Sequence, residues 1–304
     1  MADTAVNALA NQYQQLDQVI FASIAPTASG AFELTASDST ALATLKSKLG
    51  SSQQLLVSVG GAGASPNMLA MAQDPVKRTA YVNALIDFCT RWKIQGIDLK
   101  WDLVANYPTP VTAPVVPNAS AYVALSQQLS AALHAKGMLF TEAIDVYYPV
   151  LNGSAVPDNS FFSLASQTYN YADQINLTCY GVYAMDKLGN QASIVQLQNW
   201  LGLLTNFGVP RSKIVVGVPF TGYPQSQLNS STALMAYADI VAKANPEPTA
   251  NNFGLYGFNG VDLIQTKASY LRQNGYGGIL ASDLSQDAPA EKFSLVNAIV
   301  NASK

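Results

Sequence analysis

The stretch QGIDLKWDL, residues 95–103, has the composition of a buried strand, yet it carries three ionisable side chains. Asp98, Lys100 and Asp102 stand at alternate positions, with apolar residues between them. Successive side chains of a strand point to opposite faces of its sheet. The stretch therefore predicts a strand with one apolar face against helices and one polar face toward a cavity.

Similar apolar, β-branched runs recur along the chain, and longer segments with helical periodicity separate them. The runs are VIFASIA (19–25), LLVSVGG (55–61), GIDLKWD (96–102), LFTEAID (139–145), QINLTCY (174–180), KIVVGVPF (213–220) and GGILASDL (277–284). Alternating strands and helices predict an α/β fold with a parallel sheet covered by helices. Seven such units in a chain of 304 residues favour a (β/α)8 barrel of the TIM type over an open doubly wound sheet.

The proline-rich segment 106–118 directly follows one of these runs, so we interpret it as a loop at the functional face. No linker divides the chain, and we expect one domain over residues 1–304. Segments such as 77–92 and 193–208 are expected to be helices, and Gly208 and Pro210 close the second of them.

The composition limits the class of partner. Hydrophobic residues make up 49% of the chain and charged residues 12%, which is typical of a large soluble domain. A net charge of -3 without any Lys/Arg cluster argues against nucleic acid or an anionic membrane. No apolar run reaches the about 18 residues that cross a bilayer, and the start has no secretory pattern. We expect a cytoplasmic protein or one exported without a recognisable signal, unless the start is trimmed.

Cysteine, histidine and glycine give no sign of a cofactor. Cys89 and Cys179 lie in apolar surroundings, which favours core residues over a disulfide. His134 is the one histidine and fits a surface position on a helix, so a metal site rich in histidine is excluded and a Ser-His-Asp triad is disfavoured. The glycines of VGGAGASP (59–66) do not match a nucleotide-binding loop, and we interpret them as a tight turn after a strand.

Taken together, five stretches resemble motifs of the family 18 glycoside hydrolases, which are the chitinases and endo-β-N-acetylglucosaminidases, and of their non-catalytic relatives such as the seed protein narbonin. VSVGG is similar to the family's S-x-G-G strand, INLTCYG to its M-x-Y-D strand, VVGVPFTG to its G-x-P-F-Y-G strand, QGIDLKWD to its D-G-x-D-x-D-x-E signature, and residues 260–287 to its last helix and strand. The order is also that of the family. The resemblance implies the family's barrel from Val19 to the C-terminus.

The resemblance also implies that the catalytic motif is degenerate. It places Asp102 at the position of the glutamate that protonates the glycosidic oxygen, and Lys100 at that of the aspartate that accepts the acetamide N–H. The carboxyl of Asp102 is about 1.5 Å short, and an ammonium group has no acceptor. A cation on the same face also lowers the pKa of Asp102, whereas a general acid needs a raised pKa. Both replacements oppose catalysis.

Other family positions have changed as well. By the same resemblance, catalytic or substrate-contacting residues are replaced at Gln95, Thr178, Gly181, Thr221 and Ser282. Asp98 and Tyr180 are what remains of the family's chemistry. Asp98, Lys100 and Asp102 then form either an ion triad that fills the old cavity or a remodelled ligand site.

Three classes of function stay open. The first is a non-catalytic barrel that acts as a carbohydrate-binding, scaffold or storage protein, with an N-acetylglucosamine-type oligosaccharide as the ligand. The second is an active glycoside hydrolase on glycans containing N-acetylglucosamine, with Asp102, Glu142 or Asp145 as its acid; Glu142 and Asp145 stand at opposite phase, so one of them can face the cavity. The third uses Lys100 as an amine nucleophile. No cofactor is expected. Besides Asp98 and Lys100, ligand contacts are expected from tyrosines at strand ends, namely Tyr147, Tyr148, Tyr180, Tyr183, Tyr223 and Tyr256.

The expected barrel either closes imperfectly, lacks or modifies its first strand, or takes this strand from another chain. Residues 7–16, NALANQYQQL, have a helical pattern where the family pattern leads us to expect a strand. Seven strands leave two unpaired edges of the sheet. We expect the helical segment 6–16 to cover this gap, or else a second copy or another chain to pair with the N-terminal edge.

Overall fold

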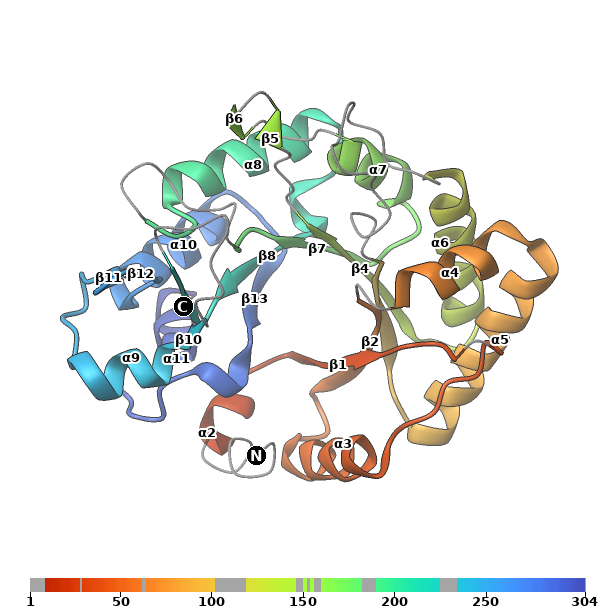
Figure 1. Cartoon of the computed structure of the whole chain (residues 1–304), viewed down its shortest axis with the longest axis horizontal. Coiled ribbons are helices and arrows are strands. Elements are labelled where there is room, and N and C mark those ends of the chain that lie inside the picture. The colour runs from red at the N-terminus through yellow and green to blue at the C-terminus, as the bar shows by residue number, and fades with distance from the viewer. Residues whose placement is uncertain are drawn as a thin grey trace. The chain divides into compact units, whose positions relative to one another are not determined.

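The computed structural model contains a seven-stranded sheet in the order β1-β2-β3-β4-β7-β8-β13 (Figure 1). The structure describes residues 9–27, 29–61, 64–101, 119–145, 150–151, 154–155, 160–181, 190–224 and 234–303. The seven strands are those expected from the sequence, and the parallel sheet with helices between its strands confirms the α/β class.

The chain forms two compact units. The first unit contains Leu16–Ile144 and Pro149–Ile175, and the second contains Met1–Gln15, Asp145–Tyr148 and Asn176–Lys304. The organisation of residues 1–304 as one domain stays a prediction.

The first unit contains the first four strands of the sheet and the helices that connect them. Its strands are β1 (Gln18–Ile24), β2 (Gln54–Gly60), β3 (Gly96–Lys100), β4 (Leu139–Asp145, whose last residue belongs to the second unit), β5 (Val150–Leu151) and β6 (Ser154–Ala155). Its helices are α3 (Ala36–Lys48), α4 (Ser65–Gln73), α5 (Pro75–Trp92), α6 (Ala119–His134) and α7 (Ser160–Thr168). β1 to β4 pair in parallel, and β5 and β6 form a separate antiparallel pair.

Local sequence explains why α5 begins and ends where it does. The carboxylate of Asp74 accepts hydrogen bonds from the first free backbone N–H groups of the helix, those of Val76 and Lys77, and Pro75 occupies the first turn. At the other end Lys93 adopts a left-handed conformation that stops the helix. One face of α5 is buried, including Tyr81 and Phe88.

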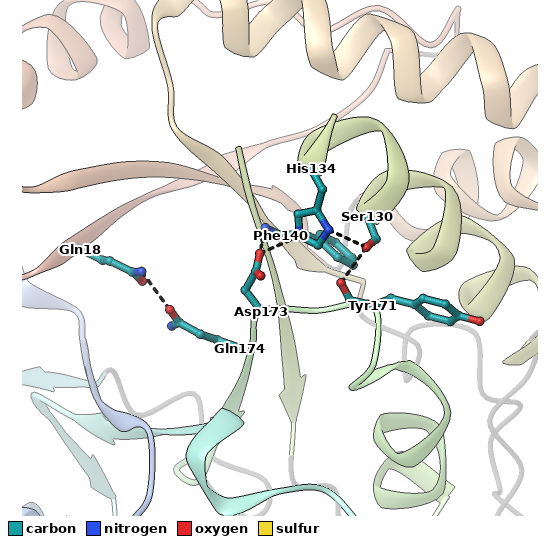
Figure 2. Close-up of polar contacts among 7 residues, drawn as sticks. All are labelled: Gln18, Ser130, His134, Phe140, Tyr171, Asp173 and Gln174. Carbon is teal, nitrogen blue, oxygen red and sulfur yellow. Dashed lines mark hydrogen bonds and ion pairs between the residues drawn. The ribbon is translucent and has the colours of Figure 1, made fainter. Parts of the chain in front are cut away.

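Glutamines at the first positions of three strands show that the sheet of the first unit curls. Gln18 of β1 donates to Gln54 of its neighbour β2 at 2.9 Å. It also donates at 2.9 Å to Gln174, the first residue of β7 (Gln174–Thr178), as Figure 2 shows. β1 and β7 are not adjacent in the sheet. Their first residues therefore meet across its concave face.

The second unit contains the end of β7, two further strands of the main sheet and a small antiparallel sheet. Its other elements are α2 (Ala10–Tyr13), α8 (Ile194–Asn206), η4 (Arg211–Lys213), β8 (Ile214–Pro219), β9 (Thr221–Pro224), β10 (Met235–Ala236), α9 (Tyr237–Ala244), β11 (Asn252–Phe253), β12 (Tyr256–Gly257), α10 (Val261–Gln273), β13 (Gly278–Ser282), η5 (Leu284–Gln286) and α11 (Leu295–Ala302). The antiparallel sheet has the order β10-β9-β12-β11.

The N-terminal segment is helical where the structure describes it. α2 buries Leu9 and Tyr13, and the side chain of Gln15 donates to Asn297 of α11 at 2.8 Å. The helix expected within residues 6–16 is thus confirmed for residues 10–13, while residues 1–8 lie outside the described part. Its role in covering a sheet edge stays a prediction.

Two smaller expectations, for the cysteines and for His134, are also met. Cys89 and Cys179 are buried and free, as expected for core residues. The side chain of His134 is 44% exposed on its helix. Among the described residues, no helix is both long enough and apolar enough to cross a membrane.

Candidate functional site

The carboxylate of Asp98 is held by hydroxyl groups from both neighbouring strands. Thr141 of β4 donates to Oδ1 at 2.7 Å, and Ser58 of β2 donates to Oδ2 at 3.2 Å. The parallel register explains the contact, because Ser58 pairs with Asp98 and Asp98 pairs with Thr141. All three side chains are buried. We call Ser58, Asp98 and Thr141 the Asp98 cluster.

The two faces of β3 separate the chemistry from the core, as the sequence predicts. Leu99 is fully buried, and the ring of Trp101 lies 5.8 Å from that of Tyr122 in α6, so these residues face the helices. Asp98 and Lys100, at the alternate positions, point to the other face. Ile97 and Leu99 of β3 thus face the helices, and Asp98 and Lys100 share the opposite face of the strand.

The end of β3 lies close to the glycine turn of β2. The carbonyl oxygen of Lys100 accepts a hydrogen bond from Gly61 N–H at 2.7 Å. A Cβ at Gly60, whose φ is +124°, would collide with this carbonyl group. Only glycine fits there, which agrees with a turn at the end of β2 where glycine is required. Residues 62 and 63 of the stretch VGGAGASP lie outside the described part of the chain. The Lys100 side chain is half-buried.

Glu142 is the acidic side chain of β4 that faces the helices. It is fully buried, and Thr168 of α7 donates to its Oε2 atom at 2.6 Å. Burial raises the pKa of Glu142 to about 7, while the hydroxyls of Ser126 and Thr168 favour the ionised form. Of the two carboxylates considered on this strand, Glu142 is therefore excluded from the polar face, which leaves Asp145.

In the second unit, Tyr180 follows β7 and lies against the next strand. A Cβ on Gly217 of β8 would come within 3.0 Å of the Tyr180 ring, so the ring packs over the glycine. Burial raises the pKa of the Tyr180 phenol, hydrogen bonds with Ser282 and Thr178 oppose this, and the charges of Tyr223 and Asp145 add to it. These groups therefore lie close together.

Tyr223 and Thr221 lie on β9 in the same unit. Burial raises the pKa of Tyr223 to about 12. Thr221 donates to Gln286 at 2.6 Å, so its hydroxyl is occupied within the protein. Tyr256 of β12 is half-buried and pairs with Pro224. Asp102, Tyr147, Tyr148 and Tyr183 lie outside the described residues, and their roles stay predictions.

A serine, a histidine and an aspartate meet at the end of α6, although the sequence disfavours a catalytic triad. His134 Nδ1 lies 3.3 Å from Ser130 Oγ, and its Nε2 lies 3.0 Å from Asp173 Oδ2 (Figure 2). Ser130 donates its one proton to the carbonyl oxygen of Tyr171 at 2.8 Å. Because its proton is used in this bond, Ser130 is not activated as a nucleophile. The hydrogen bonds of Ser130 and His134 instead connect α6 to the residues just before β7.

Metal chemistry has no donor set in the described part of the chain. No group of three or more His, Cys, Asp or Glu side chains is placed to hold an ion there. In the first unit, the described residues offer a carboxylate held by two hydroxyls, with an ammonium group on the same face of β3. The second unit, by itself, offers the phenol groups of Tyr180 and Tyr223.

Comparison with known proteins gives a consistent result. The family model described as Glycosyl hydrolases family 18 matches residues 2–287. Probable chitinase 10 of Drosophila melanogaster is 22% identical over 294 residues, which is 81% of this chain and 13% of that protein. Chitinase 1 of Aphanocladium album is 24% identical over 280 residues, which is 78% of this chain and 62% of that protein. The chain thus spans less than two thirds of both relatives.

Solved structures share the fold. The GH18 chitinase ChiB of Flavobacterium johnsoniae has a TM-score of 0.78 at 20% identity, covering 99% of this chain and 91% of that one. The chitinase-like agglutinin RobpsCRA of Robinia pseudoacacia has a TM-score of 0.77 at 18% identity, covering 99% and 97%. A class V chitinase of Nicotiana tobaccum in complex with NAG4 has a TM-score of 0.74 at 17% identity, covering 95% and 92%. The TIM-type fold expected from the sequence is confirmed.

Proposed function

Because the chain belongs to the glycosyl hydrolases family 18, we propose that it is a non-catalytic, chitinase-like protein that binds N-acetylglucosamine-type oligosaccharides. The observation that carries the proposal is Lys100, which ends β3 on the same face as Asp98. An ammonium group has three donors and no acceptor. It cannot hold the acetamide N–H that substrate-assisted hydrolysis must position.

The Asp98 cluster supports a structural or binding role for this face. Each oxygen of the Asp98 carboxylate accepts a hydrogen bond from a buried hydroxyl. Such bonds fix the position of the carboxylate. A fixed anion beside a half-buried cation can orient polar ligand groups without transferring a proton. At the position of the acid, the short side chain of Asp102 adds to the same conclusion.

Tyrosines support a sugar as the ligand. A phenol offers an apolar ring and a hydroxyl that donates or accepts, a combination that suits sugars. Tyr180 and Tyr223 are such groups in the second unit. Proteins of the same fold include a chitinase in complex with NAG4 and a chitinase-like agglutinin. Both names are consistent with sugar binding on this fold.

Calorimetric titration with chitotetraose tests the binding part of the proposal. We expect saturable heat with the wild type, and an affinity at least about tenfold lower for Tyr180→Ala, because a lost aromatic contact together with the lost burial of the ring costs about 1.4 kcal/mol or more. Tyr276→Ala is the matched control, since Tyr276 stacks on Tyr270 beside Arg211. If the wild type gives no heat, binding of this sugar is refuted, and a scaffold or storage protein is the function to pursue.

The alternative is an active hydrolase that takes its acid from another carboxylate. Glu142 faces the helices, which leaves Asp102 and Asp145. Asp145 ends β4 at opposite phase to Glu142, and its charge acts on Tyr180. Release of reducing ends that Asp145→Asn or Asp102→Asn abolishes, and Glu142→Gln spares, would establish this alternative.

A further inference from the structure

A lysine is fully buried in α10 of the second unit, away from any role considered so far. Lys267 is 1% exposed, and its Nζ donates a short hydrogen bond to Asn259 Oδ1. Burial lowers the pKa of Lys267 to about 7, and the charge of Cys179 opposes this. Burying an amine is costly unless its donors are used. The hydrogen bond from Lys267 to Asn259 therefore offsets part of the cost of burying the amine.

The lysine fixes the orientation of the Asn259 side chain. An amine or ammonium group that donates to Asn259 must face the amide oxygen, so the amide nitrogen must point the other way. There Asn259 Nδ2 donates to the backbone carbonyl of Gln191 at 2.7 Å. Asn259 is 1% exposed, so water cannot readily replace either contact. Without the donor at Lys267, both orientations of the amide become available.

The chain of hydrogen bonds continues to the turn beside Tyr180. Gln191, which is fully buried, donates from Nε2 to the carbonyl oxygen of Gly181 at 2.9 Å. Gly181 has a φ of +119° and directly follows Tyr180. A Cβ on Gly181 would meet nothing within 4 Å, so the conformation of the backbone, not a shortage of space, favours glycine there. The contact with Gln191 holds this turn.

We infer that Lys267 is a positioning residue for Tyr180, acting through Asn259 and Gln191 on the backbone turn at Gly181. The inference rests on the proposed function in that Tyr180 matters as a ligand contact. The link between Lys267 and the turn does not depend on that function, because the three hydrogen bonds connect the amine to the turn whether or not a sugar binds. Both forms of Lys267 can donate to Asn259, but the ammonium group donates a stronger, charge-assisted hydrogen bond than the neutral amine. Titration of Lys267 therefore loosens or tightens the first bond, and the change is felt at the turn.

Selective isotope labelling makes the turn directly observable. With 13C-carbonyl tyrosine and 15N-glycine, a carbonyl-filtered amide spectrum shows only Tyr-Gly pairs, and the sequence has three, ending in Gly181, Gly257 and Gly277. We expect the Gly181 signal to move in one step with a midpoint near 7 as pH rises from about 5.5 to 8.5. Gly277, bonded to Arg211 and Ile214, is the internal control and should not follow that step.

Two variants assign the step to this chain of bonds. Lys267→Met removes the titrating group, and Gln191→Met keeps it but cuts the last contact, so the Gly181 step should vanish in both. The other titratable groups around Lys267 are Cys179, whose thiol pKa burial raises far above this range, and, through Cys179, Asp145. A Gly181 step that persists in Lys267→Met would assign the titration to another group and overturn the inference.

The inference and the proposed function fail in different ways. If Lys267→Met does not fold, the wild type and Gln191→Met still decide, because a Gly181 signal without a step in the wild type refutes the inference. For chitotetraose we expect about tenfold weaker binding to Gln191→Met at pH 6. If the wild type does not bind chitotetraose but shows the step, the proposed ligand is wrong and the positioning role stands.

Discussion

At the level of single residues, the alternation of side chains along β3 was predictable, and the partners of those side chains were not. The spacing in residues 95–103 predicts that Asp98 and Leu99 face opposite ways, and the structure confirms it. Ser58 and Thr141 became partners of Asp98 through strand register, which depends on how three segments far apart in the chain align. No local pattern carries that information.

The hydroxyl of Thr141 should be important for stability. Thr141→Val keeps the shape of the side chain but removes the donor to Asp98, and a buried charged group that loses a hydrogen bond costs about 1.5–3 kcal/mol. Urea unfolding would measure the loss. Thr90→Val is the control, because this exposed hydroxyl bonds to Ile86 within α5 and its loss should cost well under about 1 kcal/mol. Equal losses of unfolding free energy in Thr141→Val and Thr90→Val would contradict a stabilising role of the Asp98 cluster.

The buried carboxyl of Glu142 should make stability depend on pH. Its pKa is raised from 4.5 to about 7, so the folded state binds more protons than the unfolded state between these values. Unfolding free energy should therefore fall as pH rises through this window, by up to about 3 kcal/mol in total, and the loss should be complete above about pH 7.

The variant Glu142→Gln isolates this effect from all other titrations. Relative to the wild type, it should gain stability steadily between about pH 4.5 and 7, measured by urea unfolding at intervals across that range. A stability difference that does not change with pH would show that Glu142 is ionised and compensated in the folded protein.

At the level of elements, long periodic segments were predictable and short ones were missed. The expected helix 77–92 corresponds to α5 (Pro75–Trp92), and the run 213–220 contains β8 (Ile214–Pro219). The antiparallel sheet β10-β9-β12-β11 was not predicted, because three of its four strands have only two residues. Two residues cannot show an alternating pattern. Lys267 was overlooked for a similar reason, since its burial comes from the packing of α10.

The contacts of Asp173 at the end of α6 should contribute to stability. Asp173 accepts from the backbone N–H of Phe140 at 2.8 Å as well as contacting His134. Asp173→Ala should therefore destabilise the protein by about 1–3 kcal/mol, because a backbone donor loses its partner. His134→Ala should cost about 1 kcal/mol or less, since this contact is partly exposed and screened. Thermal unfolding of both variants would check the order, and a larger effect of His134→Ala would contradict it.

At the level of the whole molecule, five motifs in the order of the family predicted the family and the fold, whereas the proposed lack of activity rests on single positions within those motifs. The sequence predicts a helix within residues 6–16, and among the described residues α2 (Ala10–Tyr13) lies in that segment. We expect a monomer, because α2 buries Leu9 and Tyr13 within its own chain. Light scattering at increasing concentration would reveal a dimer, which would instead favour pairing of the N-terminal edge with a second copy.

The most direct test of the central claim, that this member of the family does not hydrolyse chitin, is a turnover assay on labelled chitotriose. We expect the wild type to release no label above the background rate in buffer, and Asp102→Ala to give this same background rate. It also predicts that Lys100→Asp with Asp102→Glu stays inactive, because Gly181 and Ser282 still replace substrate contacts. Release by the wild type that Asp102→Ala abolishes would contradict the account and establish an active hydrolase.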